Sequence, residues 1–185
     1  YSGTPAVTTN RLNGNPVVSF NGSSYLTTTF NFDILQQYTI FSVARYTGPD
    51  SYNRVIASRT RNDLFGFHSS GDERWHMEGW IYNGGTANTN WHLHTGTINN
   101  ESDPKANFWK EGNQLAFNAN GSSDNNFKPG RVELGGYNGS SELSKCEVAE
   151  LIIFDHVLTS NELNQVGGYL SQKNGLSTAY PATNG

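Results

Sequence analysis

Short segments in which apolar and polar residues alternate recur along the whole chain. Alternation places successive side chains on opposite faces of an extended segment, which is the pattern of a half-buried β-strand. Many of these segments are separated by Asn-Gly or Gly-Gly pairs, whose residues adopt the positive φ that tight turns require. The pattern predicts strands at Val17–Phe20, Tyr38–Ala44, Arg54–Ser58, Leu64–His68, Trp75–Tyr82, Trp91–Ile98, Ala106–Lys110, Arg131–Gly135 and Val148–Phe154.

Only one segment carries the signals of a helix. Thr159 and Glu162 form a capping box at its start, and Asn174-Gly175 supplies a C-terminal stop. The apolar residues at helical spacing between these ends are Leu163, Val166 and Leu170. Because parallel strands need helical crossovers, which are missing here, the pattern predicts an all-β, antiparallel two-sheet sandwich. We expect the helix to cover one edge or end of this sandwich.

Length and charge narrow the class of protein further. The chain has 185 residues, which is one ordinary domain. Its net charge is −4 and it has no cluster of Lys and Arg, so nucleic acid is not an expected partner. The longest apolar run, Leu151–Phe154, is far shorter than the roughly 20 residues that span a bilayer, so membrane insertion is not expected. The lone cysteine, Cys146, excludes an internal disulfide and is interpreted as a partly buried free thiol.

We expect residues 1–176 to form the domain and residues 177–185 to form a linker-like tail. The tail is small, polar and contains Pro181, and the chain begins with Tyr1 instead of Met. Both features are typical of a segment that is covalently linked to other domains in a longer chain.

Several motifs follow one another in a specific order over residues 12–176. The closing motifs are Val148–Asp155, Val157–Thr159, the helix with Glu162, Gly168–Leu170 and Lys173–Leu176. The upstream motifs are Pro16–Leu26, Tyr38–Ala44, Trp91-His92, Phe108–Gly112 and Val132–Gly136. In this order they resemble bacterial laminin-G-like domains, which are concanavalin A-like jelly rolls. The chain departs from that family at Glu111, where the family has Asn or Asp, and in the acidic loop between Asn99 and Lys105.

The resemblance implies a jelly-roll sandwich with one short C-terminal helix. It also implies a scaffold that occurs in adhesins, in glycan-binding modules and in parts of carbohydrate-active enzymes. A shared fold does not by itself assign a function.

The segment from His68 to Tyr82 is the richest in aromatic and polar side chains. If Trp75–Tyr82 is one strand, its core face carries Trp75, Met77 and Ile81, and its other face carries His76, Glu78, Trp80 and Tyr82. Sugars bind by laying their apolar faces on aromatic rings while polar groups take the hydroxyls. We therefore predict Trp80 and Tyr82 as stacking platforms, His76 and Glu78 as hydroxyl partners, and Asp72 or Arg74 as loop contacts. In the alternative, both aromatic rows are structural and the second sheet covers one of them.

Two kinds of metal site are also considered. Calcium takes oxygen ligands, which are abundant in Pro49–Asn53 and Ser123–Asn126, and laminin-G-like domains often carry calcium. His92 and His94 share a strand face and have the spacing for a zinc or copper site. In the alternative, these two histidines are half-exposed strand residues that bind their neighbours by hydrogen bonds. The sequence names no individual metal ligand.

The residues that a hydrolase needs are poorly matched, so we expect no enzyme. Concanavalin A-like glucanases resemble one another in a Glu-x-Asp-x-x-Glu strand, and the nearest string here is the loop Glu101–Pro104. Glu147 and Glu150 are three residues apart on a strand, so they are expected to face opposite sides. For Glu150, the family resemblance suggests a structural carboxylate that binds backbone or an arginine near the helix.

These observations favour a non-catalytic carbohydrate-binding or adhesion module of a larger secreted or cell-surface protein. Its expected partner is a glycan or cell-surface polysaccharide, and calcium is its candidate cofactor. The alternative is a structural spacer or protein-interaction domain of a multi-domain adhesin, with no glycan site. A hydrolase is the third and least supported interpretation.

Overall fold

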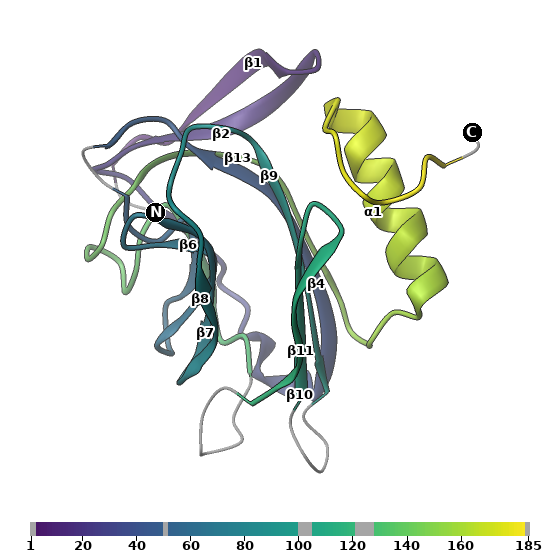
Figure 1. The fold of residues 1–185 in the computed structure, drawn as a ribbon. Coiled ribbons are helices and arrows are strands. Elements are labelled where there is room, and N and C mark those ends of the chain that lie inside the picture. Colours follow the sequence, from purple (N-terminus) through teal and green to yellow (C-terminus); the bar gives the residue numbers. More distant parts are fainter. Residues whose placement is uncertain (1–2, 50–51, 100–104, 121–127, 184–185) are drawn as a thin grey trace.

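The chain forms two antiparallel β-sheets packed face to face, with one helix on the outside (Figure 1). A computed structural model describes residues 3–49, 52–99, 105–120 and 128–183. The seven-stranded sheet has, in spatial order, β1 (Ala6–Leu12), β2 (Asn15–Asn21), β13 (Lys145–Phe154), β4 (Gln37–Tyr46), β9 (His92–Asn99), β10 (Lys105–Lys110) and β11 (Asn113–Ala119). The six-stranded sheet has β3 (Leu26–Thr27), β12 (Val132–Leu134), β5 (Ile56–Ser58), β6 (Asp63–His68), β7 (Gly71–Met77) and β8 (Trp80–Gly84). The predicted all-β jelly-roll sandwich is confirmed.

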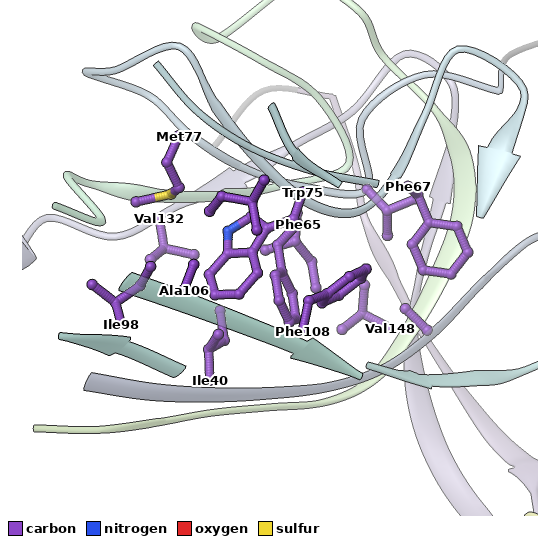
Figure 2. Close-up of a cluster of buried hydrophobic side chains, with 14 of the residues drawn as sticks. Ile40, Phe65, Phe67, Trp75, Met77, Ile98, Ala106, Phe108, Val132 and Val148 are labelled. Carbon is purple, nitrogen blue, oxygen red and sulfur yellow. The ribbon is translucent and has the colours of Figure 1, made fainter. Parts of the chain in front are cut away.

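The main core lies between the two sheets and is rich in aromatic rings (Figure 2). Phe65 and Trp75 of the six-stranded sheet both meet Phe108 of the seven-stranded sheet, each with ring centroids 5.6 Å apart. Gly96 makes this contact possible, because a Cβ atom there would lie 2.5 Å from the Trp75 ring. Burial of these rings supplies the main attraction between the sheets.

Helix α1 (Ser160–Asn174) covers the outer face of the seven-stranded sheet. Leu170 is fully buried there against a second apolar cluster that includes Phe41, Val43 and Leu93. The prediction that the helix covers an edge or end of the sandwich is therefore wrong. The reason is that the outer face of this sheet also carries apolar residues, Phe41 and Val43 of β4 and Leu93 of β9, which need a cover.

The predicted helix ends are confirmed. Thr159 and Glu162 bind each other's backbone N–H groups in a capping box, and Gly175 ends the helix in the left-handed conformation, with φ of 65°. A short 3-10 helix, η1 (Phe32–Ile34), was not expected. Among the described residues, no helix has the length and apolar character needed to cross a membrane.

Strand β13 carries a bulge between Val148 and Glu150 in its pairing with β4. The bulge shifts the alternation by one residue, so Glu147 and Glu150 both lie on the outer face, contrary to the sequence-based expectation. Glu147 pairs with Arg11 and Arg45, at 2.8 and 2.7 Å. Glu150 pairs with Lys173 of α1, so it is a structural carboxylate near the helix, although its partner is a lysine and not an arginine.

Residues after the helix return to the sandwich and pack against it. The Ala179 N–H donates to the Glu111 carbonyl at 2.8 Å, and the Tyr180 hydroxyl binds Thr95 Oγ1 at 2.7 Å. Tyr180 also lies against Gly112 and Gly167, which leave room for its backbone and ring. The part of the expected tail up to Tyr180 is thus seated on the domain, whereas a connection to further domains stays a prediction.

Candidate functional site

The segment predicted as one strand, Trp75–Tyr82, is a hairpin of β7 and β8. The chain turns at Glu78, which has φ of 50°, and the Met77 N–H donates to the Gly79 carbonyl at 2.8 Å. The prediction of a single strand is therefore wrong. Met77 and Ile81 are buried in the core as expected, because each lies on the inner side of its own strand.

A bulge in this hairpin separates Trp80 from Tyr82. Trp75 pairs with Tyr82, and His76 pairs with Trp80, so Ile81 is the extra residue of β8. Tyr82 consequently follows Trp75 toward the core, where its ring lies 6.1 Å from that of Phe108. Tyr82 is thus not beside Trp80 on the outer face, which corrects the predicted pair of stacking platforms.

Trp80 lies on the edge strand of the six-stranded sheet and is 42% exposed. The His68 ring stacks against its indole with centroids 6.2 Å apart, and the His76 ring meets it edge-on at 5.0 Å. The two imidazoles hold the indole in a fixed orientation on the outer face. An aromatic ring that is exposed and oriented in this way is suited to stack on the apolar face of a ligand.

Further polar groups extend this surface across the sheet. Glu142 lies between His68, at 3.4 Å from its Nδ1 atom, and Arg54, at 2.7 Å from its Nε atom. The Arg54 guanidinium lies over the Tyr137 ring, 3.9 Å from its centroid. We refer to Arg54, His68, Arg74, His76, Trp80, Tyr137 and Glu142 as the Trp80 surface. The sequence identified only Arg74, His76 and Trp80. Arg54, Tyr137 and Glu142 come from other segments of the chain, and His68 lies at the start of the same segment but was given no role.

His68 lies among one carboxylate and several basic groups of the Trp80 surface. Burial lowers the pKa of His68, the carboxylate of Glu142 opposes this shift, and the charges of Arg54 and Arg74 add to it, so the net shift is downward. His68 is therefore neutral at neutral pH, and it can offer both a donor and an acceptor.

Glu78 and His76 are both engaged with the loop before β6. His76 Nδ1 lies 2.7 Å from the Asn62 carbonyl, and Glu78 Oε1 accepts from the Asn62 N–H at 3.0 Å. These hydrogen bonds hold the tip of the β7–β8 hairpin against the loop before β6. His76 and Glu78, which were predicted to bind sugar hydroxyls, thus already form hydrogen bonds within the protein. Glu78 also lies in the turn and not on a strand face.

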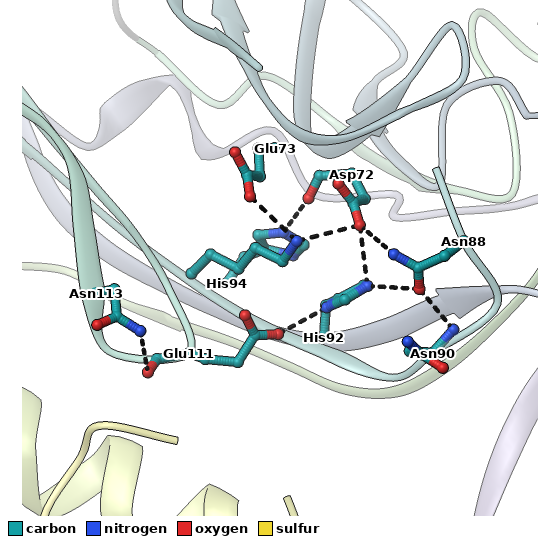
Figure 3. Close-up of polar contacts among 9 residues, drawn as sticks. Asp72, Glu73, Asn88, Asn90, His92, His94, Glu111 and Asn113 are labelled. Carbon is teal, nitrogen blue, oxygen red and sulfur yellow. Dashed lines mark hydrogen bonds and ion pairs between the residues drawn. The ribbon is translucent and has the colours of Figure 1, made fainter. Parts of the chain in front are cut away.

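Asp72 is not a loop contact, because it lies in β7 and is only 1% exposed. It belongs to a polar group that we call the His92 cluster: Asp72, Glu73, Asn88, His92, Lys110 and Glu111 (Figure 3). His92 lies between two carboxylates, 3.1 Å from Asp72 and 2.6 Å from Glu111. Lys110 lies 3.1 Å from Asp72 and 3.2 Å from Glu73. The cluster joins strands of both sheets at one end of the sandwich.

The charges in this cluster stabilise one another. Burial opposes ionisation of Asp72, but hydrogen bonds from His92 and Lys110 outweigh it and hold the pKa of Asp72 at about 2. Burial also opposes protonation of His92, but its bonds to Asp72 and Glu111 outweigh that effect and raise the pKa of His92. The ammonium group of Lys110 supplies a positive charge beside the carboxylates of Asp72 and Glu73.

His92 and His94 share a strand face as expected, with ring centroids 5.9 Å apart. They are 6% and 0% exposed, so the expectation of half-exposed residues is wrong: the second sheet covers them. His94 donates through Nε2 to the Asp72 carbonyl at 2.7 Å, and burial lowers the pKa of His94 to about 3. Within the described ranges, no group of three or more His, Cys, Asp or Glu side chains is arranged to hold a metal ion.

Several predicted features lie outside the described residues. They are Asp50 in the first calcium loop, Ser123–Asn126 in the second, and Glu101–Pro104 in the string nearest to a glucanase motif. Calcium binding therefore remains a prediction. Cys146 is free, as expected, but it is fully buried and not partly buried, and burial raises the pKa of its thiol.

Solved structures with a similar fold include domain 4 of AbnA, an extracellular GH43 arabinanase from Geobacillus stearothermophilus, in complex with arabinotriose. It has a TM-score of 0.65 and 15% identity, over 88% of this chain and 80% of that one. The heptameric SAP-like pentraxin of Limulus polyphemus has a TM-score of 0.57 and 13% identity, over 91% and 85% of the two chains. These likenesses show the fold.

A third similar structure is the binding domain of Paraclostridial Mosquitocidal Protein 1. It has a TM-score of 0.62 and 11% identity, over 90% of this chain. The present chain spans 46% of that chain, so the likeness covers less than half of it. No family model matches the sequence, and no curated protein matches it either. The laminin-G-like resemblance therefore stays a prediction within the jelly-roll fold.

Proposed function

We propose that this β-sandwich is a non-catalytic carbohydrate-binding module of a larger secreted or cell-surface protein, and that Trp80 is its sugar platform. The observation that carries the proposal is the exposed indole of Trp80, held between His68 and His76 on the outer face of the six-stranded sheet. Polar groups that could bind sugar hydroxyls are present on the same surface, because Glu142 and Arg74 lie there with His68. An aromatic platform with polar groups at its rim matches the amphipathic faces of a sugar ring.

The similar structures support a binding role. One of them is domain 4 of an extracellular arabinanase in complex with arabinotriose, and another is the binding domain of a mosquitocidal protein. Both are parts of larger proteins, which agrees with the proposed linkage to other domains and with a place outside the cell. Calcium in the loops with Asp50 and Asp124 is an additional element of the proposal.

The test is a glycan-array screen of the purified domain, run in parallel with millimolar calcium and with a chelator. The wild-type domain is compared with Trp80→Ala and with Tyr169→Ala as a matched control. Tyr169 is also exposed, at 52%, but lies on α1 beyond the other sheet. We expect Trp80→Ala to lose about tenfold or more in glycan affinity, because stacking of this kind is worth about 1.4 kcal/mol. Tyr169→Ala is expected to bind like the wild type.

Three results would change the proposal. Full binding by a folded Trp80→Ala variant would remove Trp80 as the platform. Glycan binding that is lost when calcium is chelated would indicate that the site lies in the calcium loops and not at Trp80. The absence of any glycan hit in either buffer would favour the alternative, a spacer or protein-interaction domain.

A further inference from the structure

Arg74 is a cation on the Trp80 surface that has no carboxylate partner within residues 3–49, 52–99, 105–120 and 128–183. Its Nη1 atom donates to the amide oxygen of Asn83, and its Nε atom is buried without a hydrogen-bond acceptor. Arg131 also lacks an ion pair among these residues. The remaining described arginines each have one: Arg11, Arg45, Arg54, Arg59 and Arg61.

A glycine in the same strand leaves space for the guanidinium group of Arg74. Gly71 pairs with His68 across β6 and β7, and a Cβ atom on Gly71 would collide with the Nε, Cζ and Nη2 atoms of Arg74. The missing side chain of Gly71 therefore leaves the space in which the guanidinium lies. The charge of Arg74 acts on His68, whose ring stacks on Trp80, so this positive charge lies on the same surface as the aromatic platform.

We infer that the Trp80 surface selects a sugar that carries a carboxylate, such as a uronic acid residue, with its ring on Trp80 and its carboxylate on Arg74. The inference rests on the proposed carbohydrate-binding function and names the class of sugar. A guanidinium and a carboxylate form strong, charge-assisted hydrogen bonds, and in such a pair both groups keep partners for their buried atoms. A neutral sugar would leave the charge of Arg74 without a counter-charge.

The number of charges favours a carboxylated sugar over a densely sulfated polymer. Arg54, the other arginine on the Trp80 surface, is already paired with Glu142 at 2.7 Å. One unpaired guanidinium matches one carboxylate per bound sugar. Polyanions are instead held by clusters of Lys and Arg, and the chain has a net charge of −4 and only 12 such residues.

The test compares matched acidic and neutral ligands by isothermal titration calorimetry. The probes are oligogalacturonate, alginate and hyaluronan oligosaccharides, each alongside its carboxyl-reduced form. We expect at least one acidic oligosaccharide to bind the wild-type domain roughly tenfold more tightly than its reduced form. Arg74→Met is expected to abolish this preference. Arg131→Met, which removes an arginine without an ion pair directly before β12, three strands from β7, is expected to retain it.

A second variant tests the position of the guanidinium and not its charge. Gly71→Ala displaces the Arg74 side chain while the net charge stays the same, so it is expected to weaken the preference for the acidic form as well. Thermal unfolding of each variant shows whether the fold is retained.

The outcomes separate this inference from the proposed function. Equal binding of acidic and reduced oligosaccharides, or a preference that persists in folded Arg74→Met, would overturn the selection of a carboxylate and leave glycan binding intact. If no acidic or neutral glycan binds, the proposed function fails, and the inference fails with it.

Discussion

The Nδ1 atom of His92 lies 2.6 Å from a carboxylate oxygen of Glu111, at the place where β9 begins and the β10–β11 hairpin turns. The same hairpin accepts a backbone hydrogen bond from Ala179 in the segment after the helix. The other ring nitrogen of His92 lies 3.1 Å from Asp72 in the second sheet. One imidazole thus connects both sheets to the hairpin that holds the C-terminal segment.

This arrangement predicts a stability that depends on pH. Because the folded state raises the pKa of His92, it binds the proton more tightly than the unfolded chain does. The contribution of His92 is therefore complete below the unfolded pKa of about 6.5, and it is lost as the pH rises through the higher folded pKa. We expect the difference in free energy of unfolding between the wild type and His92→Gln to shrink as the pH is raised from about 5.5 to 9.

The prediction concerns the difference in unfolding free energy between the wild type and His92→Gln, because other groups titrate in the same pH range in both proteins. Burial, together with the charge of Glu78, raises the pKa of Asp63 to about 8, and this effect is common to both proteins. Urea unfolding at each pH gives the two free energies. A difference that stays constant over this range would show that His92 is not protonated between the two carboxylates.

Removal of the segment after α1 is expected to destabilise the domain. The Tyr180 ring packs over Gly112 and Gly167, and its hydroxyl binds Thr95 at 2.7 Å. A chain that ends at Leu176 should lose about 2–4 kcal/mol of unfolding free energy, and Tyr180→Phe about 1 kcal/mol from the lost hydrogen bond. Chemical denaturation of both variants provides the measurement. Unchanged stability of the shortened chain would mean that this segment is a linker.

Gly96→Ala is expected to disturb the packing of the two sheets. Its new Cβ atom would lie 2.5 Å from the Trp75 ring and 2.8 Å from that of Phe65, both in the tightly packed core. Overpacking at such a site costs about 1–3 kcal/mol. Differential scanning calorimetry should show a lower melting temperature. Gly48→Ala is a suitable control, because a Cβ atom at Gly48 would have no atom within 4 Å.

Tyr82→Ala is expected to lower stability, whereas Trp80→Ala is expected to lower glycan affinity and leave stability nearly unchanged. Tyr82 packs on Phe108 in the core, so its truncation should cost about 2–4 kcal/mol of stability. Trp80 is 42% exposed and contacts mainly the two imidazoles, so its loss should change stability by less than about 1 kcal/mol. Thermal melts and glycan titrations of both variants test this separation. A large loss of stability in Trp80→Ala would assign the indole to the core.

Local patterns predicted the helix and most of the strands. The helix was located from its capping box at Thr159 and Glu162 and its stop at Gly175, because these signals act within a few residues of chain. Strands β1 and β11 were missed, since both lie at edges of the sheet and most of their side chains are exposed. An edge strand buries too few residues to impose a strict alternation on its sequence.

The candidate site was predictable only in part. The sequence identified Trp80, His76 and Arg74, which the structure brings to one surface with His68. It misplaced Tyr82, because a turn at Glu78 and a bulge at Ile81 each shift the alternation, and neither leaves a distinct signal in the residue pattern.

The amino-acid sequence by itself determined that this protein is an antiparallel sandwich closed by one helix, because alternation, turn residues and helix caps are properties of neighbouring residues. Only the tertiary structure decided which polar and charged groups meet. His92 lies between Asp72 and Glu111, and Glu142 joins His68 to Arg54, across separations of up to 88 residues along the chain. Such contacts depend on strand order, register and bulges, which the burial of the whole core sets and no local segment encodes.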